Sequence, residues 1–209
     1  MHPRETSAPA GKGYDPIKRI LDFIFGSILF VLTLPIQAVI GCLVRVKLGS
    51  PVVFKQERPG KDGRVFTLRK FRTMIDVDPD AGLVADEARI TPLGAKLRST
   101  SLDELPTLWN VVKGDMSLVG PRPLLVRYLD RYTPEQARRH EVRPGVTGLA
   151  QVSGRNSLTW EEKFNLDVEY VENRSFRLDC KILTRTVTAV FARRGISHDD
   201  HVTMHEFVG

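Results

Sequence analysis

The feature that most constrains this chain is a run of 22 residues without a charge, from Phe23 to Val44. As a straight α-helix it would be about 33 Å long, enough to cross a hydrocarbon core of about 30 Å. The run has no polar face and is longer than the apolar stretch of most signal peptides, although residues 39–42 loosely resemble a lipoprotein cleavage box. We therefore predict a membrane segment rather than a buried core helix or a cleaved leader.

The residues around this run leave its topology open. Basic residues flank both ends, and a spanning helix would have to export one pair, although positive flanks favour the cytoplasm. Pro35 lies near the middle and removes one helical hydrogen bond, so a kinked helix could enter and leave the same face. The Thr33 hydroxyl is the nearest candidate partner for the freed carbonyls. A spanning and a re-entrant helix remain equally compatible with these residues. The flanking residues are Lys18, Arg19, Arg45 and Lys47.

A basic block follows the apolar run. Nine basic and two acidic residues lie between Arg45 and Arg72, a surplus of seven positive charges against +6 for all 209 residues. Such a block beside a membrane segment predicts contact with anionic lipids, at about 1 kcal/mol per close basic residue. A pI of about 9.5 also suits nucleic-acid binding. The position of the block favours the membrane, and we predict no nucleic-acid partner. Two cysteines exclude a disulfide scaffold.

The remaining patterns predict an α+β fold, mainly helical with a small antiparallel hairpin. Residues 52–54 and 65–68 are strand candidates around a GKDG turn at 60–63. Short helices are expected at 105–112, 124–132 and 134–141. A capping box formed by Thr159 and Glu162 predicts the start of a further helix. A last helix is expected over 178–194, with Ile182 and Leu183 on its buried face. We divide the chain into a disordered 1–14, a membrane helix at 15–47, a folded domain at 48–195 and a tail at 196–209.

Two adjacent carboxylates are the first chemical signal. Asp103 and Glu104 lie at the start of a short predicted helix, whose dipole favours the charged form and lowers the pKa of Asp103. An ionised aspartate could act as a nucleophile, and its neighbour could hold Mg²⁺ together with a substrate phosphate. Acidic residues at helix starts are also common caps, so this pair alone leaves both roles open.

Rigid and glycine-rich turns that carry arginine are the second signal. Pro121 and Pro123 restrict the backbone on both sides of Arg122, which reduces the entropy lost when its guanidinium binds a phosphate. Neither a P-loop nor a dinucleotide-binding glycine motif is present, which argues against nucleoside triphosphatases and dinucleotide enzymes. Further phosphate or sugar contacts are expected from a later turn, and two basic residues after the hairpin are either membrane-facing charges or phosphate ligands. These candidates are Arg155 and Asn156 in the turn, and Lys70 and Arg72 after the hairpin.

Three segments together resemble the monotopic phosphoglycosyl transferases, the small single-domain bacterial sugar transferases. They are QERPGKDGRVFTLRKFRTM at 56–74, ARITPLGAKLRSTSLDELPTLWNVVKGDMSLVGPRP at 88–123 and RPGVTGLAQVSGRN at 143–156, within a match from Lys18 to Gly195. The resemblance implies transfer of a sugar-1-phosphate from a UDP-sugar to a polyprenol phosphate, usually undecaprenyl phosphate, with release of UMP. It also implies Mg²⁺ and a covalent phosphosugar intermediate on an aspartate.

The resemblance assigns roles residue by residue. Asp103 takes the nucleophile position, Glu104 completes the dyad and shares the metal, and Arg98 belongs to the same motif. The remaining matches imply contacts to the diphosphate, nucleotide or sugar. These residues are Lys70, Arg72, Pro121, Arg122, Pro123, Arg155, Asn156 and Asp167.

The family also carries a re-entrant helix, so the resemblance implies a monotopic protein on the cytoplasmic face of the bacterial inner membrane. One departure concerns the bend, where Leu34-Pro35 replaces the common Ser-Pro. Another is Thr107 in place of a frequent Gln, which we expect to matter little. The tail HVTMHEFVG is similar to tails of members acting on N-acetylated amino-modified sugars such as diacetylbacillosamine. An oligomer is possible, and a non-catalytic, basic, membrane-anchored adaptor is the alternative function.

Overall fold

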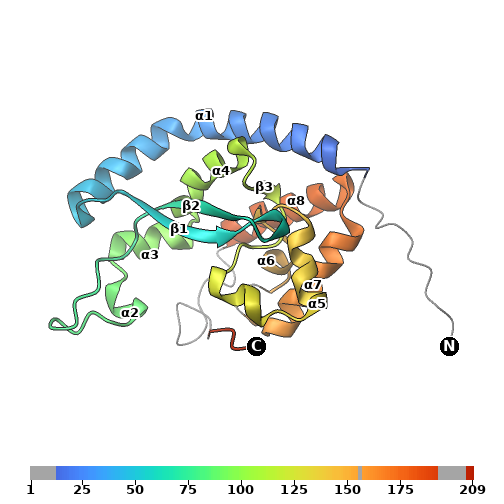
Figure 1. Cartoon of the computed structure of the whole chain (residues 1–209). Helices are drawn as coiled ribbons and strands as arrows, with labels where there is room; N and C mark the ends of the chain where they lie inside the picture. Colours follow the sequence, from blue (N-terminus) through green and yellow to red (C-terminus); the bar gives the residue numbers. More distant parts are fainter. Residues whose placement is uncertain (1–12, 155–156, 193–205) are drawn as a thin grey trace.

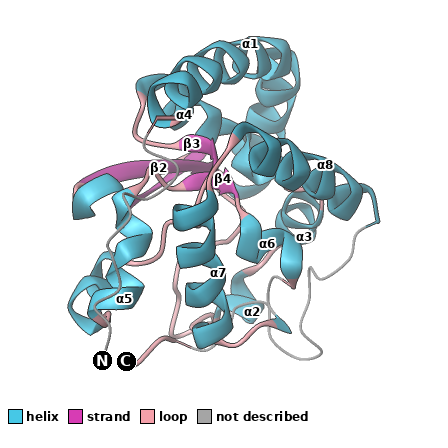
Figure 2. Ribbon diagram, turned by 90° about the vertical axis from the view of Figure 1, so that its right-hand side faces the viewer, coloured by secondary structure: helices cyan, strands magenta, loops and turns pink. Residues whose placement is uncertain are grey.

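The computed structural model describes residues 13–154, 157–192 and 206–209. The predicted α+β class is confirmed as a mainly helical protein with a small antiparallel hairpin. The strands lie between α1 (Asp15–Leu48) and α4 (Leu108–Lys113) on one side and α5 (Pro134–Ala137), α6 (Leu149–Ser153) and α7 (Trp160–Asn173) on the other (Figure 2). In chain order the elements are α1 (Asp15–Leu48), β1 (Val53–Pro59), η1 (Lys61–Gly63), β2 (Val65–Phe71), α2 (Asp86–Arg89), α3 (Pro92–Ser99), η2 (Leu102–Thr107), α4 (Leu108–Lys113), β3 (Ser117–Val119), η3 (Val126–Arg131), α5 (Pro134–Ala137), η4 (Arg138–Glu141), β4 (Gly145–Thr147), α6 (Leu149–Ser153), α7 (Trp160–Asn173) and α8 (Phe176–Ala192).

The apolar run forms one continuous 34-residue helix, α1, which arches over the domain (Figure 1). Pro35 lies inside it and cannot donate to the carbonyl of Val31. The Thr33 hydroxyl contacts the carbonyls one turn earlier, 2.7 Å from Leu29 O and 3.1 Å from Phe30 O. The helix is long and apolar enough to cross a membrane, and only 11% of its most apolar window is buried within the protein. Re-entry and the kink remain predictions.

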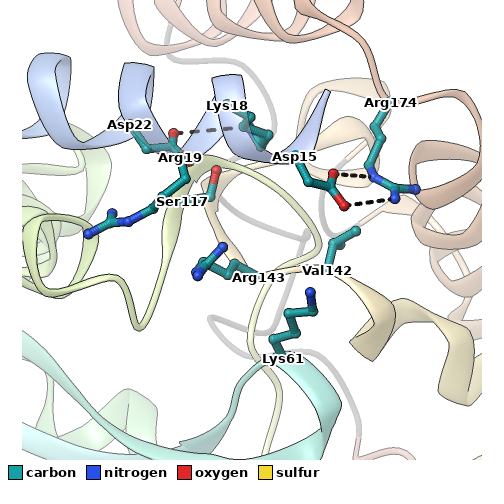
Figure 3. Close-up of a pocket in the computed structure, with 9 residues that line it drawn as sticks. All are labelled: Asp15, Lys18, Arg19, Asp22, Lys61, Ser117, Val142, Arg143 and Arg174. Carbon is teal, nitrogen blue, oxygen red and sulfur yellow. Dashed lines mark hydrogen bonds and ion pairs between the residues drawn. The ribbon is translucent and has the colours of Figure 1, made fainter. Parts of the chain in front are cut away.

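Both halves of α1 pack on the same domain. At its C-terminal half, Ile40 and Val44 are buried against Phe71 and Leu97. At its N-terminal end the contacts are polar, and they surround the pocket in Figure 3, where Asp15 pairs with Arg174 at 2.8 Å.

The basic residues before the apolar run turn inward. Lys18 is buried in an ion pair with Asp179, and Arg19 donates to the carbonyls of Val111 and Val112 at 2.8 and 2.9 Å. Lys18 and Arg19 precede the apolar run, but both satisfy acceptors of the domain rather than pointing to a membrane surface.

The predicted hairpin is confirmed, and it is longer than the apolar residues alone suggested. β1 and β2 pair antiparallel from Val53 opposite Phe71 to Pro59 opposite Val65. Gly60 N donates to Arg64 O at 2.8 Å, and Gly63 takes a positive φ of 72° in the turn. The hairpin carries charged residues into the interior along β2, where Lys70 is followed by buried Phe71 and Arg72.

A second, parallel strand pair was not predicted. β3 and β4 pair through Ser117–Gly145 and Val119–Thr147. The backbones of Gly120, after β3, and Gly145, in β4, approach each other so closely that a Cβ on Gly145 would lie 2.1 Å from Gly120 N. This contact fixes the loop that follows β3 against β4, and that loop carries Arg122.

The C-terminal helices complete the core. The predicted capping box opens α7, where Thr159 Oγ1 accepts from Glu162 N at 3.2 Å. On α8, Ile182 is buried as predicted, but Leu183 is 38% exposed, so its assignment to the buried stripe is wrong. Phe207, from the tail, is buried among Tyr128, Phe164 and other aromatic rings. Residues 196–205 of the predicted tail and residues 1–12 of the predicted disordered N-terminus lie outside the described residues.

Candidate active site

The carboxylate pair lies on η2, which is fastened to the hairpin by buried polar contacts. Thr107 Oγ1 donates to Arg69 O at 2.9 Å, and Asn110 Nδ2 donates to Thr67 O at 2.8 Å. Thr107 thus ties η2 directly to β2. Ser101, just before the helix, has a positive φ of 57°, a strained conformation for a serine and one often found at functional sites.

Glu104 is held by two cations. Its Oε1 lies 2.5 Å from Lys70 Nζ and 3.0 Å from Arg122 Nη2. Burial alone would raise the pKa of Glu104, but Lys70 and Arg122 outweigh it and lower the pKa to about 2. Burial in turn lowers the pKa of Lys70, against the attraction of Glu104. Glu104 is therefore ionised at neutral pH, and it joins β2, η2 and the loop after β3.

Asp103 is different, because the residue is buried as a whole but its carboxylate oxygens are unpaired and still accessible. It is 8% exposed, and no side chain or backbone group of the described residues hydrogen-bonds or ion-pairs with it. Burial, followed by the charge of Glu104, raises the pKa of Asp103 despite the nearby cations. The prediction that a helix dipole lowers this pKa is therefore wrong, since desolvation dominates on a short 3₁₀ helix.

Two predicted arginines lie outside the cluster around Glu104. Arg98 Nε donates to Thr73 Oγ1 at 3.1 Å, and its charge acts on Asp103 by lowering the pKa of that carboxyl. Arg72 is 8% exposed, and its guanidinium binds the carbonyls of Ser50 and Leu48 at 2.9 and 3.3 Å. The structure does not bring Arg72 to the pocket beside Glu104, because these carbonyls hold it at the junction between α1 and β1.

The loop of Arg122 is held from behind by a buried ion pair. Arg139 Nη2 donates to Arg122 O at 2.7 Å and to Asp167 Oδ2 at 2.7 Å, and both charged side chains are almost fully buried. Asp167, predicted to bind substrate, instead binds Arg139. Pro121 also belongs to the scaffold, because its carbonyl accepts from Gly145 N at 2.9 Å.

These elements line an open pocket beside the dyad of Asp103 and Glu104. Its polar wall contains Lys70, Glu104, Arg122 and one residue that the sequence did not single out, Arg58. Leu68, Met116 and Val146 supply apolar lining, and Pro123 lies at its edge. Arg58 on β1 pairs with Phe66 on β2, and this pairing brings its side chain to the pocket. The sequence alone does not show the pairing. Arg155 and Asn156 lie outside the described residues.

The described residues contain no group of three or more His, Cys, Asp or Glu side chains that could form a metal cage. The dyad still offers oxygen ligands, since the Asp103 carboxylate is unpaired and both cations contact Oε1 of Glu104 rather than Oε2. Mg²⁺ commonly binds one or two carboxylates, substrate phosphates and waters, so this donor set suits that cation.

A family model described as bacterial sugar transferase matches residues 13–193. The chain belongs to the bacterial sugar transferase family. This confirms the family predicted from the three motif segments. It also agrees with the apolar helix in indicating a membrane-associated protein.

Similar proteins cover the chain almost completely. EpsL of Bacillus subtilis, named an uncharacterized sugar transferase, is 54% identical over 194 residues, which are 92% of this chain and 96% of EpsL. A UDP-glucose:undecaprenyl-phosphate glucose-1-phosphate transferase of Caulobacter vibrioides is 38% identical, over 83% of this chain and 69% of the relative. The undecaprenyl-phosphate galactose phosphotransferase of Salmonella typhimurium is 36% identical, and the match spans 41% of that longer protein.

Proposed function

We propose that this sugar transferase moves a sugar-1-phosphate from a UDP-sugar to undecaprenyl phosphate and releases UMP. The observation that carries the proposal is the unpaired carboxylate of Asp103, which feels the charges of Lys70 and Arg122 and adjoins Glu104 in the wall of a pocket that Arg58 also lines. Relatives named for undecaprenyl-phosphate sugar phosphotransfer support the same reaction class. In a more specific form of the proposal, the donor sugar is N-acetylated and amino-modified, as in diacetylbacillosamine. This form rests only on the sequence of the C-terminal tail.

The reaction has two displacements at one phosphorus atom. An oxygen of ionised Asp103 attacks the phosphorus that bears the sugar, the bond from that phosphorus to the bridging oxygen breaks, and UMP leaves with the bonding pair. A phosphate oxygen of undecaprenyl phosphate then attacks the same phosphorus, and the carboxylate of Asp103 leaves. Lys70 and Arg122 orient Glu104 and bring positive charge to the diphosphate. Mg²⁺, held by Asp103 and Glu104, supplies further charge neutralisation when bound.

We further propose that α1 is re-entrant, so that the protein is monotopic on the cytoplasmic face of the bacterial inner membrane. Both ends of α1 pack on one domain, through Lys18 with Asp179 and through Val44 with Phe71. A single domain lies on one side of a bilayer, which favours re-entry over a spanning helix. Basic residues that stay outside the pocket, such as Arg45 and Lys47 in the last turn of α1, are the candidates for contact with anionic lipids.

The test is UMP release in nanodiscs with undecaprenyl phosphate, Mg²⁺ and a panel of UDP-sugars that includes an amino-modified donor. Wild type and Asp80→Asn, a change at an exposed carboxylate, should release UMP with one donor, whereas Asp103→Asn should not. Without acceptor, wild type should gain the mass of one phosphosugar and Asp103→Asn should not. Equal activity in Asp103→Asn would remove Asp103 as nucleophile, and absence of UMP from every donor would favour the adaptor.

A further inference from the structure

The pocket beside the dyad has more positive charge than its protein partners balance. Arg58, Lys70 and Arg122 line it, and Glu104 is the only carboxylate among its described lining residues. Lys70 and Arg122 both contact that carboxylate. Arg58 forms no ion pair with any carboxylate that the structure describes.

Arg58 is also incompletely hydrogen-bonded. Its Nη2 donates to Gln56 Oε1 at 2.5 Å and its Nη1 to Pro123 O at 3.3 Å, but its Nε is buried without a partner in the described structure. Burial, together with the like charge of Arg122, lowers the pKa of Arg58 to about 10, so the side chain is still cationic at neutral pH. A partly buried cation with an unused hydrogen-bond donor and no counter-charge destabilises the fold, unless a bound anion accepts from the donor and balances the charge.

We propose that Arg58 is a phosphate-binding residue of this site, with its guanidinium taking a phosphate oxyanion of a substrate. The inference rests on the proposed function and deepens it. Arginine suits this role because its planar fork donates to two phosphate oxygens at once. The contact to Pro123 O links this side chain to the loop of Arg122, so the two guanidinium groups flank one pocket. The oxyanion belongs either to the diphosphate of the donor or to the phosphate of the polyprenol acceptor.

The test compares Arg58→Gln and Arg58→Lys with Arg64→Gln, an exposed arginine on the same hairpin. Steady-state kinetics in nanodiscs should show the KM of one substrate raised about 10-fold or more in Arg58→Gln, partly recovered in Arg58→Lys and unchanged in Arg64→Gln. A change in the KM of the UDP-sugar assigns the oxyanion to the donor, and a change in the KM of undecaprenyl phosphate assigns it to the acceptor. Unchanged KM values for both substrates would overturn the proposal.

A second measurement does not need turnover. UMP and inorganic pyrophosphate should raise the Tm of wild type and Arg64→Gln, and should raise that of Arg58→Gln much less. Without anions, Arg58→Gln should melt at or above the wild-type temperature, because an uncompensated buried charge is removed. A lower Tm together with an unchanged response to anions would make Arg58 a structural residue and overturn the proposal. If wild type releases no UMP but pyrophosphate binding depends on Arg58, the proposed reaction fails while the anion site stands.

Discussion

At the scale of single residues, the two carboxylates of the dyad have opposite electrostatics. Lys70 and Arg122 keep Glu104 ionised, whereas burial and the charge of Glu104 raise the pKa of Asp103. Adjacent positions in the sequence therefore serve different purposes. Glu104 binds the two cations, and the Asp103 carboxylate stays unpaired, as its proposed role as nucleophile requires.

The raised pKa predicts the pH dependence of the first step. In the proposed mechanism Asp103 attacks only when ionised, so UMP release in a single turnover should fall as the pH drops through its folded pKa. Mg²⁺ on the dyad would lower that pKa, so the acid limb should lie above the ordinary value of 3.8 at limiting Mg²⁺ and move to lower pH as Mg²⁺ is raised. Lys70→Gln removes a charge that lowers the pKa of Asp103, and its acid limb should move to higher pH. Glu104 has a pKa of about 2 and does not titrate in this range in wild type. An acid limb at or below 3.8 in wild type at limiting Mg²⁺ would contradict the assignment.

Arg139 should act on the reaction through the backbone of Arg122. Arg139→Lys keeps a positive charge for Asp167 but loses the fork that also holds Arg122 O. We expect about a 10- to 100-fold lower kcat/KM, as for the loss of one charge-assisted hydrogen bond, in a protein that stays folded. Arg138→Lys is the matched control, at a partly exposed neighbour whose guanidinium pairs with surface glutamates and does not contact the loop of Arg122. The measurement is steady-state kinetics with circular dichroism, and wild-type kinetics in Arg139→Lys would exclude the positioning role.

At the scale of elements, Pro35 is the residue on which the topology of α1 depends. Pro35→Ala restores the N–H donor to Val31 O and favours a straight helix of about 51 Å, long enough to span. In a protein without native cysteines (Cys42→Ser, Cys180→Ser), Ser7→Cys should resist a membrane-impermeant maleimide in intact cells. Labelling should rise when Pro35→Ala is added and stay low with Leu34→Ala. Strong labelling before either change would show a spanning helix.

The sequence predicted the elements whose signals are local. The hairpin follows from two short apolar runs on either side of GKDG, and α7 follows from Thr159 and Glu162. The three-residue strands β3 and β4 carry no comparable signal, because they pair across about 25 residues through glycine contacts. The dyad and its two cations were predicted from motifs, but Arg58 reaches the pocket only through hairpin register, and the inward turn of Asp167 depends on Arg139.

At the scale of the whole molecule, the polar junction between α1 and the domain should be sensitive to the loss of either charge of its buried ion pair. Lys18 is buried with Asp179, whose carboxylate also accepts from Tyr14 and Tyr170 at 2.9 and 2.8 Å. Lys18→Met leaves Asp179 buried without its cation, which should cost about 3–5 kcal/mol. Lys47→Met, at the exposed far end of α1, should cost little. Thermal unfolding in nanodiscs gives the Tm of both variants. Equal Tm values for Lys18→Met and Lys47→Met would show that Asp179 does not need the charge of Lys18.

The uncovered side of α1 has a practical consequence. Large apolar side chains such as Phe25, Val31 and Leu32 are half or more exposed. Soluble proteins rarely expose an apolar surface of this kind to water. The protein should sediment with vesicles, resist extraction by salt or alkali, and enter solution only with detergent. When detergent is scarce, molecules should stick together through α1. Sizes measured under such conditions would then report the packing of bare helices, and only a bilayer or a full micelle would give the true number of copies.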